Sequence, residues 1–180
     1  SGFPDRPEHG WQEVVDQLVE CYEMEARPRD AVMLLERECE ALHRPGTGSV
    51  REVRCLLKLS DLYSDLDLES PCSSRLAQAE EIAADRGPLP MLERNSLEIA
   101  RIAAALRAIN RAESDEQTDA AVALAADAFS RVELIFDSLA PEQQNRYQLY
   151  RAQFAQRSQD PTAAAELFCG AFTGIIWGSE

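Results

Sequence analysis

The fold class follows from one stretch of the chain, MLERNSLEIARIAAALRAINRA, which occupies residues 91–112. It is rich in alanine, and its leucine and isoleucine residues recur mostly at intervals of three and four positions. That interval is the period of an α-helix, and these residues cover most of the helix circumference. Because such a helix needs neighbours on most of its sides, the stretch predicts a central helix in an all-α domain.

Seven further segments show the same apolar spacing, and turn residues such as proline, glycine and serine separate them. No alternation of apolar and polar residues is long enough to predict a strand. The short connections favour antiparallel neighbours. We therefore predict an all-α fold of about eight antiparallel helices arranged as helical hairpins. The segments outside 91–112 cover residues 11–26, 29–43, 50–66, 73–85, 119–139, 142–156 and 161–176.

The composition is that of a folded, globular chain. It has 180 residues, of which 45% are hydrophobic and 28% charged, and a chain of this length fits one or two domains. Apolar residues occur throughout, so the chain can bury a core without metals or disulfides. We expect residues 1–10 to be a disordered leader and residues 11–180 to form a single helical domain.

The charge balance is strongly acidic, with 18 basic and 32 acidic residues and a formal net charge of -14. No basic patch interrupts it, so the surface repels nucleic-acid phosphates and anionic lipid. The longest apolar run, at residues 167–177, is about half the length that a bilayer crossing needs. We expect neither nucleic acid nor a membrane as a partner.

The five cysteines are odd in number and include no Cys-x-x-Cys pair. Together with the absence of a visible targeting signal, this pattern favours a reduced intracellular compartment, cytoplasmic or nuclear. Cys21, Cys39 and Cys55 lie within apolar helix patterns and are expected to be buried. Cys72, in the sequence SPCSS, is expected in an exposed loop.

The sequence contains no recognisable catalytic or cofactor motif. Glu40 and His43 have the Glu-x-x-His spacing of di-iron bundles, but such a site needs a second pair. The chain has two histidines and no glycine-rich phosphate loop, so no catalytic triad can be assembled. We therefore expect a protein that is not an enzyme and that holds no metal or cofactor.

Small residues recur where two helices of a hairpin would approach each other. Ala152 and Ala155 are followed by Ala164, Phe168 and Ala171 at the spacing of a helical repeat. In these positions the chain resembles the tetratricopeptide-repeat family. The resemblance implies a superhelix of helical hairpins that binds a peptide or helix in its concave surface. It departs from the family in its irregular spacing and in lacking the glycine beside the small residue, so an irregular helical bundle stays the alternative.

Two features of the sequence point to binding of a protein partner. The first is the acidic row Glu13, Asp16, Glu20 and Glu23, which lies opposite the apolar residues of segment 11–26. Such a row steers a basic partner segment, and the alternative is a face that only keeps the chain soluble.

The second feature is an apolar cluster near the C-terminus that includes Phe168, Phe172 and Trp177. It is apolar all round, which is unusual for a terminal helix covered on one side. Two explanations stay open, since the cluster either docks into the domain core or contacts another protein, for example as a homodimer through this helix.

Taken together, these features predict a non-catalytic scaffold or adaptor domain, part of a larger protein or complex, that presents an acidic helical surface or groove. Its expected partner is a basic or amphipathic protein segment. The alternative is a regulatory domain that binds a small apolar ligand between helices, with Tyr147, Tyr150 and Trp177 in the wall of the site.

Overall fold

The computed structural model describes residues 8–43 and 48–157, and within them it contains seven α-helices, one short 3-10 helix and no strand. The prediction of an all-α fold is confirmed. The expected eighth helix, at residues 161–176, lies outside the described residues. The helices are α1 (Glu8–Met24), α2 (Pro28–Leu42), α3 (Val50–Asp65), α4 (Glu69–Arg86), α5 (Met91–Arg111), α6 (Asp115–Glu133), η1 (Phe136–Ser138) and α7 (Pro141–Arg157).

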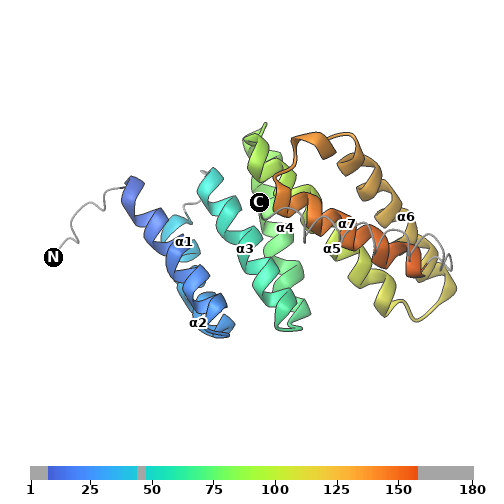
Figure 1. Cartoon of the computed structure of the whole chain (residues 1–180), viewed down its shortest axis with the longest axis horizontal. Coiled ribbons are helices and arrows are strands. Elements are labelled where there is room, and N and C mark those ends of the chain that lie inside the picture. The colour runs from blue at the N-terminus through green and yellow to red at the C-terminus, as the bar shows by residue number, and fades with distance from the viewer. Residues whose placement is uncertain (1–7, 44–47, 158–180) are drawn as a thin grey trace, which may run out of the picture. The chain divides into compact units, whose positions relative to one another are not determined.

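The chain divides into two compact units, residues 1–89 and residues 90–180. The first unit contains α1 to α4, and the described part of the second contains α5, α6, η1 and α7 (Figure 1). Each unit buries its own set of apolar side chains. The single domain expected over residues 11–180 stays a prediction, and the units are described separately.

The first unit is organised around α3. This helix buries eight side chains, and Val53 and Leu59 among them are fully inaccessible to solvent. Its neighbours α2 and α4 both pack directly against it, while α1 packs on α2. A helix that is apolar on most of its surface needs cover on more than one side. The order of packing in this unit follows from that requirement.

Two helices of the first unit end in the same type of turn. Ala26 follows α1 and Asp67 follows α3, and each has a φ of 56°. In each turn the next backbone N–H donates to a tyrosine carbonyl at 2.8 Å, that of Tyr22 in the first and of Tyr63 in the second. This is the hydrogen bonding of a Schellman motif. The connection from α1 to α2, around residue 26, and the connection from α3 to α4, around residue 67, therefore contain the same type of turn.

A carboxylate ties three helices of the first unit together. Glu36 on α2 accepts a hydrogen bond from the Tyr63 hydroxyl of α3 at 2.6 Å. It also accepts from the Arg75 guanidinium of α4 at 2.6 and 3.2 Å. Because the pair of bonds from Arg75 has fixed geometry, it sets the register of α4 against α2.

The second unit is built on α5, which packs against both α6 and α7. Helix α6 lies close to α5 because Ala125 and Ala128 of α6 have small side chains. Both residues face the core and are almost fully buried. Aromatic rings fill the space beside α7, where Tyr147 lies 5.7 Å from Phe129 and 5.4 Å from Phe136 between ring centroids. The central position expected for residues 91–112 holds within this unit.

Three helix boundaries differ from the sequence prediction by four residues or more. Helix α4 begins at Glu69 and not at Ser73, because Pro71 lies in its first turn, where a proline costs no backbone hydrogen bond. Helix α6 begins earlier because Ser114 caps it, accepting from the Gln117 N–H at 3.3 Å. The same helix ends at Glu133, before η1, and Pro141 starts α7.

Replacing Leu106 by alanine tests the core of the second unit. Leu106 is 3% exposed, and we expect Leu106→Ala to lower the free energy of unfolding by about 3 kcal/mol through lost burial and a cavity. Leu124 on α6 is 62% exposed and gives the control, since Leu124→Ala is expected to stay within about 0.5 kcal/mol. Urea denaturation measures both. Equal losses of unfolding free energy in the two variants would mean that Leu106 of α5 does not contribute to this core.

The hydrogen bond from Tyr63 to Glu36 predicts that the Tyr63 hydroxyl loses its proton only at high pH. Burial and this bond raise the pKa of Tyr63 to about 12, against an ordinary value of about 10. The stabilisation is therefore complete below about pH 10 and is lost as the pH rises through about 12. The ultraviolet difference between wild type and Tyr63→Phe during titration isolates this residue. Glu36→Gln is expected to bring that pKa down towards 10, and a wild-type value already near 10 would contradict the contact.

Candidate functional site

Helix α1 buries only a narrow row of side chains. Val15 and Val19 are buried, and Trp11 and Tyr22 on the same side are half-buried. The spacing of four, four and three positions places these residues in a single row along the helix. The rest of α1 faces away from the core of the unit and forms its outer surface.

Part of that outer surface is apolar. Val14 is 44% exposed, Leu18 is 39% exposed, and Cys21 is exposed as well. We call these three residues the outer row of α1. The sequence analysis placed all apolar residues of this segment on one side. The structure separates them into the buried row and the outer row, which lies on the side of α1 away from the acidic residues.

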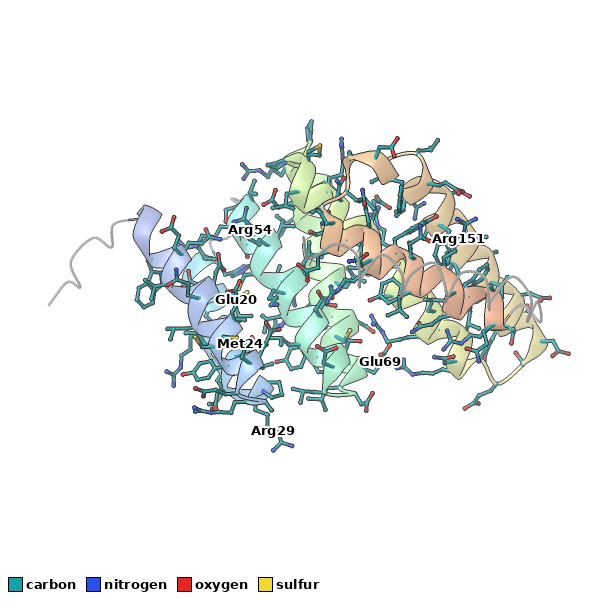
Figure 2. All side chains as sticks on the ribbon, viewed as in Figure 1. Glu20, Met24, Arg29, Arg54, Glu69 and Arg151 are labelled. Atoms are coloured by element: carbon teal, nitrogen blue, oxygen red, sulfur yellow. The ribbon has the colours of Figure 1, made fainter. Side chains whose placement is uncertain are left out.

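The four acidic residues predicted for partner binding are all exposed on α1. The acidic row faces three basic side chains of α3, and its Glu23 is bonded to Lys58 at 3.0 Å. Figure 2 shows Glu20 on α1 and Arg54 on α3, the neighbouring helix. The acidic row consists of Glu13, Asp16, Glu20 and Glu23, and the basic residues of α3 are Arg51, Arg54 and Lys58.

The basic side chains act on Asp16. Burial raises the pKa of the Asp16 carboxyl above its ordinary value, and the neighbouring carboxylate of Glu20 adds to this effect. Attraction by Arg54, and more weakly by Arg51, lowers the pKa without cancelling the rise. Asp16 through burial and Glu23 through Lys58 are therefore the acidic residues held against the rest of the unit, whereas Glu13 and Glu20 form no ion pair among the described residues.

A buried carboxylate fixes α1 in place. Glu38 on α2 is 7% exposed and accepts a hydrogen bond from the Trp11 indole at 2.9 Å. Arg51 on α3 forms an ion pair with the other oxygen of Glu38. Because a buried carboxylate without partners is costly, these two contacts hold the first half of α1 at a defined position.

The structure thus brings together one of the two predicted binding features. Glu13, Asp16, Glu20 and Glu23 lie together on the surface, while Phe168, Phe172 and Trp177 lie outside the described residues. Sequence reasoning did not identify the three basic residues of α3, although their spacing of three and four positions was a visible signal. It also did not identify the outer row.

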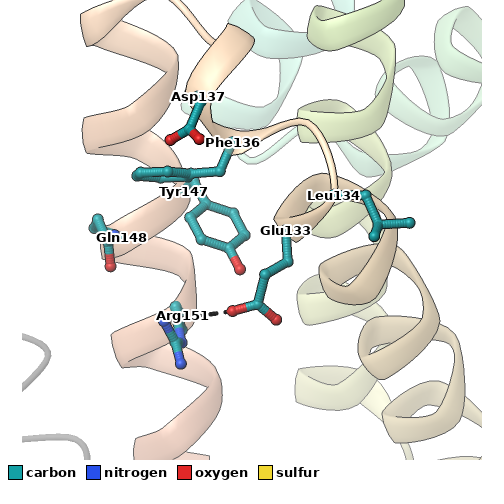
Figure 3. Close-up of a pocket in the computed structure, with 7 residues that line it drawn as sticks. All are labelled: Glu133, Leu134, Phe136, Asp137, Tyr147, Gln148 and Arg151. Carbon is teal, nitrogen blue, oxygen red and sulfur yellow. Dashed lines mark ion pairs between the residues drawn. The ribbon is translucent and has the colours of Figure 1, made fainter.

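A pocket of about 260 Å³ in the second unit is the alternative site (Figure 3). Tyr147 and Phe136 form part of its lining, but the remainder includes the ion pair of Glu133 with Arg151 at 3.9 Å. Leu134, on its rim, is 87% exposed. This mixed and open lining gives no support to a site for an apolar ligand. Tyr150 packs against the core of the unit, and Trp177 lies outside the described residues.

Two cysteines differ from the prediction. Cys21 is exposed and not buried, because it belongs to the outer row of α1. Cys72 is fully buried and not exposed, because residues 69–72 form the first turn of α4 and its thiol packs beside Ser60. Cys39 and Cys55 are buried, as expected.

The Glu-x-x-His pair does not form a ligand set in the described part of the chain. Glu40 is exposed, and His43 Nδ1 instead lies 2.9 Å from the carboxylate of Glu52 on α3. Among residues 8–43 and 48–157, no three histidine, cysteine or acidic side chains are arranged to hold a metal ion. Over the same residues, no helix has the length and apolarity needed to cross a membrane.

Comparisons of the chain with protein-family models, curated proteins and solved structures find no match. Function is therefore inferred from the residues of the site.

Replacing Asp16 by asparagine tests the electrostatics of this surface. Because burial raises the Asp16 pKa, its ionisation costs folding stability as the pH rises from about 3 through that value. We expect Asp16→Asn to gain stability relative to wild type between about pH 3 and about pH 7, as measured by urea denaturation. Glu81→Gln, on the exposed surface of α4, should show a smaller change. A relative loss for Asp16→Asn at neutral pH would mean that Arg54 and Arg51 dominate.

Proposed function

We propose that the protein is a non-catalytic interaction domain whose helix α1 binds a basic, amphipathic helix of a protein partner. The observation that carries this proposal is the outer row, with Val14 and Leu18 exposed on the side of α1 away from the acidic row. Apolar residues that recur along one side of a helix usually contact another helix.

The turn that recurs around residues 26 and 67 supports a packing partner for this row. The two segments can be aligned on their turns, so that Ala26 matches Asp67. In this alignment the three residues of the outer row match three residues of α3 that are all buried. One of them, Cys55, contacts Cys39 and the Leu35 carbonyl of α2. The outer row is Val14, Leu18 and Cys21, and its counterparts in α3 are Cys55, Leu59 and Leu62.

This correspondence gives the partner its shape. On α3 these positions are buried, and Cys55 among them contacts α2, so on α1 the same positions are open to a helix placed in the same way. We propose that α1–α2 and α3–α4 are two helical repeats of the tetratricopeptide kind. The repeat of the turn supports this arrangement, and the separation of residues 26 and 67 is longer than that family's repeat.

Charge gives the partner its chemistry. Residues 1–89 contain ten basic and nineteen acidic residues, a net charge of -9 for the first unit. Glu13 and Glu20 lie exposed on the acidic side of the same helix, and among the described residues neither forms an ion pair. A helix with lysine or arginine beside its apolar stripe therefore complements both parts of the surface. An intracellular location and a homodimer through the C-terminal residues stay predictions.

Fluorescence anisotropy tests the proposal with a defined probe. The probe is a labelled peptide of about 16 leucines and lysines in helical amphipathic order, and its comparison is a peptide of equal composition in alternating order. We expect the amphipathic peptide to bind the full chain about tenfold more tightly. Val14→Ser/Leu18→Ser should reduce its affinity about tenfold, because each exposed side chain is partly buried by the partner.

Matched variants separate a specific site from general acidity. Glu13→Gln/Glu20→Gln removes two charges from the acidic row of the same helix, and we expect about a fivefold loss of affinity. Glu81→Gln/Asp85→Asn removes two exposed charges from α4 and should leave the affinity within about twofold. Circular dichroism checks that each variant is folded. Equal binding of the two peptides, or equal losses for the two charge variants, would show the proposal to be wrong.

A further inference from the structure

Two buried thiols face each other between α2 and α3. The sulfur atoms of Cys39 and Cys55 are 2.7 Å apart, and each residue is 6% exposed. Both side chains are free thiols. A disulfide bond is about 2.0 Å long, so the sulfurs need to approach by only about 0.7 Å to form one. The two helices already pack directly against each other.

We propose that Cys39 and Cys55 are a redox-sensitive pair that forms an intrachain disulfide with hydrogen peroxide and locks α2 to α3. In the first step one thiol loses its proton and its sulfur attacks a peroxide oxygen. This gives a sulfenic acid and one water. In the second step the other sulfur attacks the sulfenic sulfur, and the hydroxyl leaves as a second water with the remaining thiol proton. Both sulfurs are thereby oxidised, and one peroxide is reduced to two waters.

The other described cysteines lack this arrangement. Cys72 is buried next to the hydroxyl of Ser60, at 3.4 Å, and not next to a second thiol. Cys21 lies exposed on the outer row of α1. In the described part of the chain, Cys39 and Cys55 are the pair of cysteines whose sulfur atoms lie within 2.7 Å of each other.

The surroundings make the reaction slow. The close contact with the Cys39 thiol, together with burial, raises the pKa of the Cys55 thiol, so little thiolate is present at neutral pH. A small uncharged oxidant suits a buried pair better than a bulky disulfide does. Rapid oxidation is therefore expected at exposed Cys21 and slow oxidation at the pair.

The cross-link would act on the surface described above. Cys39 is next in sequence to Glu38, whose carboxylate holds Trp11 of α1 and Arg51 of α3. Joining residues 39 and 55 closes a short loop of the chain, which restricts the unfolded state. The oxidised first unit is therefore expected to be more stable than the reduced one, with α1 held at the same place.

Peptide mapping of the full chain gives the primary test. In the Cys21→Ser/Cys169→Ser background, prolonged treatment with hydrogen peroxide is expected to remove two hydrogens from the intact mass and to link the peptides that contain Cys39 and Cys55. The melting temperature should rise on the order of 10 °C and return after reduction by dithiothreitol. A link to Cys72, or oxidation of the pair to sulfinic acid without a link, would overturn the proposal.

Single variants of the same background provide the control. Cys39→Ala and Cys55→Ala should each abolish the rise in melting temperature on oxidation, whereas Cys72→Ala should retain it. The mapping of the unsubstituted pair does not depend on how well these variants fold. Persistence of the rise without Cys39 would also show the proposal to be wrong.

Discussion

The first unit depends on the burial of α3. Leucine and valine residues occur on most sides of this helix, and Val53 and Leu59 are completely excluded from solvent. Burial of such side chains is the main favourable term in folding, so α2 and α4 are both drawn against α3. Among the described helices, α1 packs mainly on α2. The outer row of α1 is exposed because the apolar contacts of this unit centre on α3.

Polar groups within this packing determine the register of the helices. Glu36 joins α2 to α3 through Tyr63 and to α4 through Arg75. Glu38, two positions further along α2, joins it to Trp11 of α1. Apolar side chains allow a helix to slide by a turn at small cost, but a buried carboxylate that loses its partners does not. The two glutamates therefore specify a single arrangement of four helices.

The sequence was sufficient for the helices and insufficient for their surfaces. Residues 91–112 gave almost the observed bounds of α5, since a strong period marks a helix irrespective of its neighbours. The prediction for Cys72 was wrong because a proline such as Pro71 is typical both of a loop and of the first turn of a helix. Cys21 was misplaced because a helix with two apolar rows does not reveal which row has a neighbour. That information depends on contacts distant in sequence, such as that of Glu38 with Trp11.

The outer row also bears on what kind of fold the first unit has. A closed bundle covers the apolar side of each helix with another helix of the same bundle. A stacked array instead leaves its terminal helix with positions that an inner helix buries. In this unit the counterparts of Val14 and Leu18 on α3 are Cys55 and Leu59, both buried. The exposure of these positions on α1 agrees with the proposed arrangement of repeats, in which a partner helix on α1 would continue the packing that α2 and α3 already show.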